Sequence, residues 1–162
     1  FFIEYIDMNE NELFFRTIQS GNTENIKLQL DRNPKLVSIT DARGFTPLIF
    51  ASYFDKEGIA KVLLEHHADV NGKDASGNTA LIGVSFKGNL ALVEMLLKHN
   101  ANVNAQNNNG TTALMYATQY NQEAVVDVLL AHNADKSLKD LEGKTALDYA
   151  KEKELKIIAE KL

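Results

Sequence analysis

The stretch GTTALMYA, residues 110–117, decides the fold, because the chain repeats it in four similar copies. The other copies are GFTPLIFA at 44–51, GNTALIGV at 77–84 and GKTALDYA at 143–150. Each copy begins 33 residues after the one before it. A fixed period of this length is typical of proteins that stack small structural units into one continuous core.

Each copy has the chemistry of a turn that leads into a helix. In the first copy a short polar run from Asp41 ends at Gly44, and glycine reaches positive φ at no steric cost. Thr46 can cap the helix that follows, and Pro47 stands at the first helical position, where its missing N–H costs nothing. A second apolar stripe, such as LVEMLL at 92–97, predicts a second helix in each unit.

The end of each second helix carries a further signal. The position just past that helix is His67, Asn100 or Asn133, and we expect a left-handed backbone there, which asparagine tolerates best after glycine. Each unit therefore reads as turn, helix, tight turn, helix and loop. No unit can bury both helix faces alone, so the units are expected to stack.

The unit DARGFTPLIFASYFDKEGIAKVLLEHHADVN, residues 41–71, resembles the ankyrin repeat, with its turn, T-P-L-H-type helix start, L-L helix end and G-A-D-V-N-type loop. The resemblance covers about residues 9–162 and implies an all-α helical solenoid with projecting turns. It implies a single ankyrin-repeat domain over residues 1–162. Its parts are an N-terminal capping repeat at 9–40, full repeats at 41–73, 74–106 and 107–139, and a truncated C-terminal capping repeat at 140–162.

The chain departs from the family pattern at two kinds of position. The histidine of the helix start is replaced by Ile49, Ile82, Met115 and Asp148. The glycine of the turn between the two helices is replaced by Asp55 and Asn121 in two units. Asp148 is a carboxylate where the other units are apolar, and we expect it to face water on the C-terminal cap.

Composition limits the classes of function. The chain has 162 residues, 44% of them hydrophobic and 24% charged, which is typical of a folded domain. Its net charge of −5 argues against nucleic-acid binding, and no apolar run approaches the roughly 20 residues that span a bilayer. With no cysteine, disulfides and thiolate chemistry are excluded. We expect a monomer and favour the cytoplasm, although the chain begins without Met and a targeting signal could precede it.

Two motifs suggest chemistry and are better explained by structure. His66, His99 and His132 recur with the repeat period, but stacked helices lie ~8–10 Å apart, too far for these residues to share one zinc ion. We expect them to stabilise helix C-termini instead. The GKT triplet ending at Thr145 lacks the earlier glycine of a phosphate-binding loop. We find no nucleophile–base pair, and we expect no enzyme activity, no cofactor and no metal.

The resemblance implies a partner-binding surface, because ankyrin proteins usually bind partners on a concave side made of turn tips and first helices. Five aromatic residues fall at these positions here, with basic residues around them, and such residues are enriched in interface hot spots. Some of the rings, Phe54 and Phe86 especially, could instead fill gaps between units. The predicted partner-binding residues are Arg43, Phe45, Tyr53, Phe54, Lys73, Ser76, Asn78, Phe86, Lys87, Asn109, Thr111, Gln119, Tyr120 and Lys139.

The sequence therefore predicts a non-enzymatic module that binds a protein or peptide on its concave face. An alternative is a regulatory or targeting segment of a larger enzyme or secreted effector, and the apolar start FFIEYI is compatible with it. A small-molecule or metal site is a third reading. The identity of the partner is not encoded in the scaffold, because one fold serves many functions.

Overall fold

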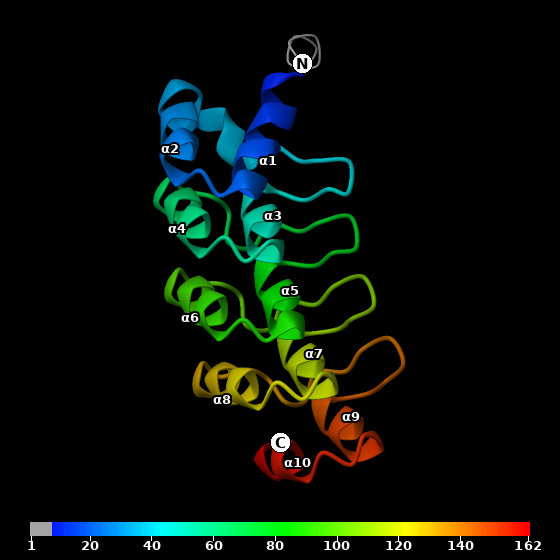
Figure 1. Ribbon diagram of the computed structural model, residues 1–162. Coiled ribbons are helices and arrows are strands. Elements are labelled where there is room, and N and C mark those ends of the chain that lie inside the picture. The colour runs from blue at the N-terminus through cyan, green and yellow to red at the C-terminus, as the bar shows by residue number, and fades with distance from the viewer. Residues whose placement is uncertain (1–7) are drawn as a thin grey trace.

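The structure is a computed structural model that describes residues 8–162. These residues form ten α-helices and no strand, so the expected all-α fold is confirmed. The helices form five consecutive pairs (Figure 1). The pairs are α1 Glu10–Ser20 with α2 Thr23–Arg32, α3 Pro47–Tyr53 with α4 Glu57–Glu65, α5 Ala80–Lys87 with α6 Leu90–Lys98, α7 Ala113–Gln119 with α8 Glu123–Ala131, and α9 Ala146–Glu152 with α10 Lys156–Lys161.

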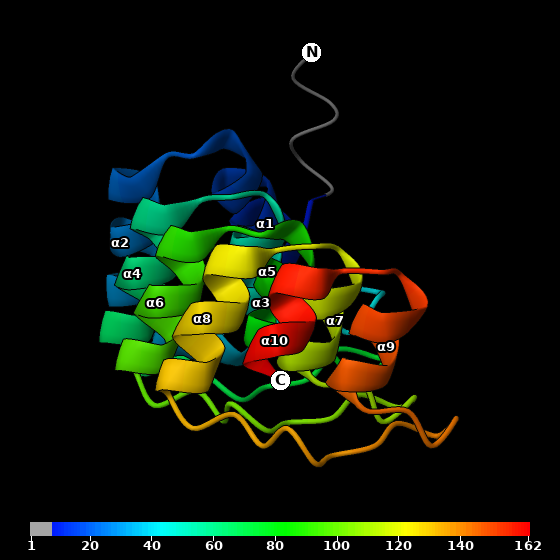
Figure 2. The same ribbon diagram turned by 90° about the horizontal axis from the view of Figure 1, so that it is seen from below.

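The pairs stack in one direction, which makes a helical solenoid of two rows (Figure 1). The inner row holds α1, α3, α5, α7 and α9, and each inner helix packs against the next one. The outer row holds the second helix of each pair. Long loops project from the inner row, and the view in Figure 2 shows them running below both rows. The inner helices therefore have one side turned toward the projecting loops and the other toward the outer row.

Each inner helix from α3 to α9 begins at a threonine, as the sequence predicts. The side chains of Thr46, Thr79, Thr112 and Thr145 each accept a hydrogen bond from the backbone N–H three residues on, at 3.1–3.3 Å. In α9 the cap is reciprocal, because the Asp148 carboxylate also accepts from the Thr145 backbone N–H at 2.9 Å. Asp148 is exposed, as expected, and it has this second role at the helix start. Its hydrogen bond from Thr145 lowers the pKa of Asp148.

The predicted left-handed positions are confirmed. His67, Asn100 and Asn133 have φ of 64°, 65° and 62°. The two residues that replace glycine between helices, Asp55 and Asn121, also have positive φ, at 55° and 54°. Aspartate and asparagine enter this region more easily than other non-glycine residues, so the tight turns survive both replacements.

The core runs continuously between the two rows. The residues that replace the family's helix-start histidine lie in it: Ile49, Ile82 and Met115 are each at most 7% exposed. The described residues include no helix long and apolar enough to cross a bilayer. At the N-terminal end, a 3₁₀ helix at Pro34–Ser38 fills the longer loop of the first unit. The apolar start FFIEYI lies outside the described residues.

Candidate partner-binding surface

The projecting turns are held in register along the stack. Within each turn the first residue bonds back to the backbone, as when the Asp41 carboxylate accepts from the N–H groups of Arg43 and Phe45 at 2.9 Å. Successive tips are then joined, because the Ala75 N–H donates to the Arg43 carbonyl at 3.2 Å and the Asn108 N–H to the Ser76 carbonyl at 3.0 Å. The tips and the exposed side of α3, α5, α7 and α9 together make one surface, called the turn-side face below.

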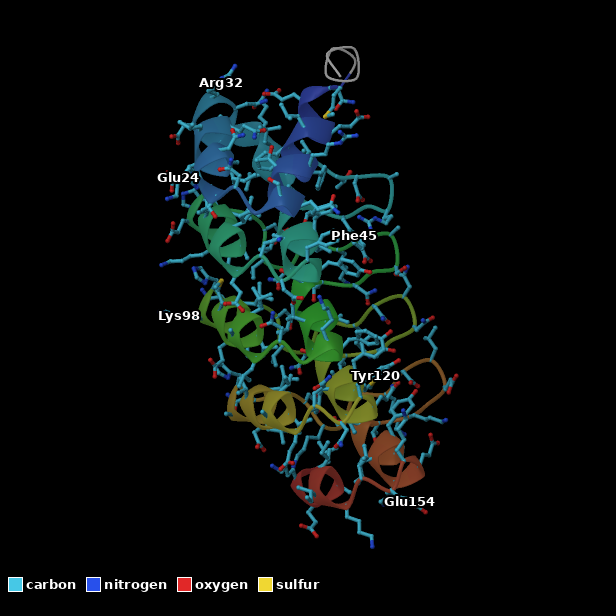
Figure 3. All side chains as sticks on the ribbon, viewed as in Figure 1. Glu24, Arg32, Phe45, Lys98, Tyr120 and Glu154 are labelled. Atoms are coloured by element: carbon cyan, nitrogen blue, oxygen red, sulfur yellow. The ribbon has the colours of Figure 1, made fainter. Side chains whose placement is uncertain are left out.

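Figure 3 shows this arrangement: Phe45 and Tyr120 lie on the loop side of the inner row, whereas Lys98 lies on the opposite side. Three large side chains of this face are exposed to an unusual degree for rings, namely Tyr53 at 52%, Phe86 at 42% and Tyr120 at 49%. Each comes from the end of an inner helix or the residue just after it.

The aromatic side chains form two separate clusters. The first belongs to the α1–α3 end, where the ring of Tyr53 lies 5.8 Å from that of Phe45 and 5.1 Å from that of Phe54. Phe54 also contacts Phe50 at 4.7 Å, which draws Phe54 into the core. Aromatic pairs at such distances stabilise beyond the area they bury, so this cluster holds Tyr53 in a defined position.

The second cluster belongs to the α5–α7 boundary. The ring of Phe86 lies 4.3 Å from Tyr120 and 5.8 Å from Tyr116, both in near-perpendicular arrangements. Here the rings come from neighbouring units, so the cluster also ties one unit to the next. Phe86 nonetheless stays exposed, whereas Phe54 becomes partly buried.

A groove of about 470 Å³ separates the two clusters. Phe45 and Tyr53 line one side of it, and Phe86 and Tyr116 line the other. Its base includes Gly83, in the middle of α5, and an added Cβ at that glycine would meet no atom within 4 Å. The groove is therefore a mainly apolar hollow bounded by rings, with Asp74 and Lys87 as its charged lining residues. Such a lining is usual for a ligand-binding depression.

Basic groups lie over the rings. The Arg43 guanidinium is 4.1 Å from the centroid of Phe45, the Lys87 ammonium 5.4 Å from Tyr53, and Lys153 5.5 Å from Tyr120. Distances under about 6 Å allow cation–π attraction, which holds these long side chains beside the aromatic surface.

Two of these cations are neutralised by carboxylates. Arg43 pairs with Asp41 and Lys87 with Asp55, each at 2.9 Å. The hydrogen bond from Lys87 lowers the pKa of Asp55. Lys153 instead donates to the Gln119 carbonyl at 2.9 Å and has no carboxylate oxygen within 4.0 Å in the described chain.

The predicted partner-binding residues differ in how far their side chains are exposed. Those that are exposed are Arg43, Tyr53, Lys73, Ser76, Phe86, Lys87, Asn109, Tyr120 and Lys139. Phe45, Phe54, Asn78 and Gln119 are partly buried. Thr111 is only 6% exposed, so its side chain offers almost no surface to a partner.

Three residues of this face were missed by the sequence reasoning, which took only the turn tips and the helix ends. Gly83 and Tyr116 occupy the tenth position of their units, which the structure also exposes to the groove. Lys153 belongs to the C-terminal cap, where no contact residues were predicted. The repeat period alone could have found Lys153, because it is one period after Tyr120.

The three periodic histidines have the predicted helix-end role. Nδ1 of His66, His99 and His132 each lies 2.9 Å from the carbonyl oxygen four residues earlier. Each ring therefore satisfies a carbonyl of its own helix. Within residues 8–162 no three His, Asp or Glu side chains are grouped so that they could hold a metal ion.

Comparison with family models gives one match, to a model described as ankyrin repeats in three copies, over residues 13–107, 67–140 and 83–161. A comparison with curated proteins found no match. Ankyrin repeats are in general protein–protein interaction modules, and domains built from them are typically not catalytic. Both the repeated turn–helix–helix geometry and the family model lead to one conclusion: the chain belongs to the ankyrin-repeat family.

Proposed function

We propose that this chain is a non-enzymatic module that binds a protein or peptide partner on the turn-side face, which is the concave face expected from the resemblance. The observation that carries the proposal is the exposure of Tyr53, Phe86 and Tyr120 on one face. Tyrosine is among the residues most enriched at the centres of interfaces, and Phe86 adds further apolar area to the same face.

Two physical arguments support this surface over others. The large exposed side chains elsewhere, such as Leu28 on α2 and Ile157 on α10, are single aliphatic residues, and scattered apolar residues of that kind are normal. The turn-side face instead joins its rings into contiguous clusters beside a groove. A stacked scaffold also holds these rings in place before binding, which reduces the ordering cost of association.

The test is affinity capture from a lysate of the organism that makes the protein, followed by mass spectrometry. The bait is compared with a triple variant, Tyr53→Ala, Phe86→Ala and Tyr120→Ala. A matched control, Leu28→Ala with Ile157→Ala, removes exposed apolar side chains of comparable exposure from the outer row. Circular dichroism first establishes that all three are folded.

The expected result is a protein retained by the wild type and by the outer-row control and lost by the triple variant. Removal of three clustered anchors is expected to cost more than about 2 kcal/mol of binding free energy. A partner that the triple variant retains as well as the wild type does would refute the proposal and direct attention to the outer row or the caps.

A further inference from the structure

The tenth position of each unit forms a row along the inner helices. The residues there are Phe50, Gly83, Tyr116 and Tyr149, each one period after the last. Three of the four positions carry an aromatic ring, and the exception is Gly83 in α5. The row of rings is therefore interrupted at one place, which is where the groove lies.

Nothing in the fold requires a glycine at this position. Gly83 lies inside a helix, is not among the residues with positive φ, and would place a Cβ in open space. Glycine in a helix interior destabilises relative to alanine. By contrast, Gly44 and Gly110 in the turns have φ of 75° and 73° and lie against the next turn. The open volume itself is the feature that Gly83 provides.

The chemistry of the hollow matches the side chain that is missing from it. Phe45 and Tyr53 on one side and Phe86 and Tyr116 on the other present ring faces and edges. An aromatic side chain between them could make the offset and edge-to-face contacts that the resident rings already make with one another. A partner ring would thus complete the interrupted row.

We propose that the gap at Gly83 receives an aromatic side chain from an acidic segment of the partner, which thereby restores the row of rings. This inference rests on the proposed function, because it assigns a subsite within the turn-side face. The mainly apolar lining of the groove favours a ring, and the lysines of the turn-side face favour an acidic residue near that ring in the partner.

The charge argument comes from cations that have no carboxylate partner within the described residues. Lys73, Lys139 and Lys153 have no carboxylate oxygen within 4.0 Å. All three are exposed residues of the turn-side face, whereas the chain as a whole has a net charge of −5. A carboxylate of the partner would pair with one of these ammonium groups without displacing a resident carboxylate.

Among the three unpaired lysines, Lys153 is the one that ring contacts connect to the groove. Phe86 borders the groove, Tyr120 lies 4.3 Å from Phe86, and the Lys153 ammonium lies 5.5 Å from Tyr120. These two steps span at most about 10 Å, which is roughly three residues of extended chain. The preferred segment therefore carries its aromatic residue about three residues from an aspartate or glutamate.

The experiment uses a phage-displayed library of random 12-residue peptides selected on the full chain. Synthetic versions of the enriched peptides are then titrated by fluorescence anisotropy. The decisive variant is Gly83→Leu, which fills the gap and leaves every ring in place. Its matched control is Gly58→Leu, the same change at an exposed helical glycine of the outer helix α4, where a Cβ meets only the Thr23 hydroxyl at 3.7 Å.

The expected result is that enriched peptides share an aromatic residue with an acidic residue about three positions away. Gly83→Leu is expected to raise their Kd by at least about tenfold, as loss of a buried anchor does, whereas Gly58→Leu leaves it unchanged. Lys153→Gln is expected to raise Kd by about two- to fivefold, as for one partly exposed ion pair, and to reduce the salt dependence.

Three results would overturn the inference, and they separate it from the proposed function. If the peptides bind Gly83→Leu as tightly as the wild type but are lost by the triple alanine variant, the gap is not a subsite and the face still binds. If they bind the triple variant equally well, both proposals fail. If no peptide is enriched, or the enriched ones lack the aromatic and acidic pair, a short acidic aromatic segment is not what this face accepts.

Discussion

Replacing Gly83 by alanine is expected to stabilise the fold. The backbone at Gly83 is helical, and the added methyl group meets no atom within 4 Å. The substitution therefore gains helix propensity and reduces the freedom of the unfolded chain without a steric penalty. From these terms we expect the free energy of unfolding to rise by about 0.5–1 kcal/mol.

The same substitution at Gly44 is expected to have the opposite effect. Gly44 has φ of 75°, and a Cβ there would lie 2.8 Å from the backbone nitrogen of Ala75 in the next turn. The left-handed conformation alone costs an alanine roughly 1–2 kcal/mol. The contact with Ala75 adds to this, because the turn tips are joined by a hydrogen bond that must shift.

Urea unfolding followed by far-ultraviolet circular dichroism measures both changes on one scale. The two alanine variants should differ from one another by roughly 1.5–3 kcal/mol at unchanged m-value. If Gly83→Ala is neutral or destabilising, the space beside Gly83 is occupied in solution, and the reasoning that treats it as an open subsite is refuted. If Gly44→Ala is harmless, the turn does not have the described backbone.

Substitutions at four further residues test the packing. Burial opposes ionisation of Asp140, but hydrogen bonds from Tyr149 and two backbone N–H groups outweigh it and hold the pKa of Asp140 below its ordinary value. The ionised carboxylate therefore contributes fully to the stability of the fold above about pH 4, and this contribution is lost as the pH falls through the lowered pKa of the folded state. Asp140→Asn should therefore lose less stability than the wild type between pH 5 and 3, in urea titrations across pH. Ser85→Ala removes a buried hydroxyl with no partner in the described chain, so the free energy of unfolding should stay the same or rise by no more than about 1 kcal/mol. Ser52→Ala breaks a 2.7 Å hydrogen bond to the Leu48 carbonyl and should lower the free energy of unfolding by about 0.5–1.5 kcal/mol. Thr79→Ala removes a helix cap and should cost about 1 kcal/mol, which Thr79→Ser should restore, again by urea unfolding.

Most of the fold could be predicted because its signals are local. The threonine caps, the glycines of the turns and the asparagines past the second helices each depend on a few neighbouring residues. The repeat then tests each signal several times. Asn100 and Asn133 adopt the expected left-handed backbone for the same reason that His67 does, although histidine is a less usual choice.

The surface was harder to predict because it depends on contacts between units. Phe54 and Phe86 carry the same expectation in the sequence, yet Phe54 is partly buried and Phe86 is exposed. Phe54 follows Phe50 by four residues and packs on it within the helix turn. Phe86 lies one repeat position earlier, equivalent to Tyr53, and both of those rings are exposed. Phe86 contacts Tyr120 of the next unit.

The hollow of the groove follows from the missing side chain at Gly83. A larger side chain at position 83 would occupy the hollow, and almost any residue other than glycine or proline would strengthen α5. The glycine removes both effects at one point in an otherwise regular array, and it does so between the two aromatic clusters. Because the fold leaves this hollow unfilled, burial of a partner's ring in it would add to the free energy of binding.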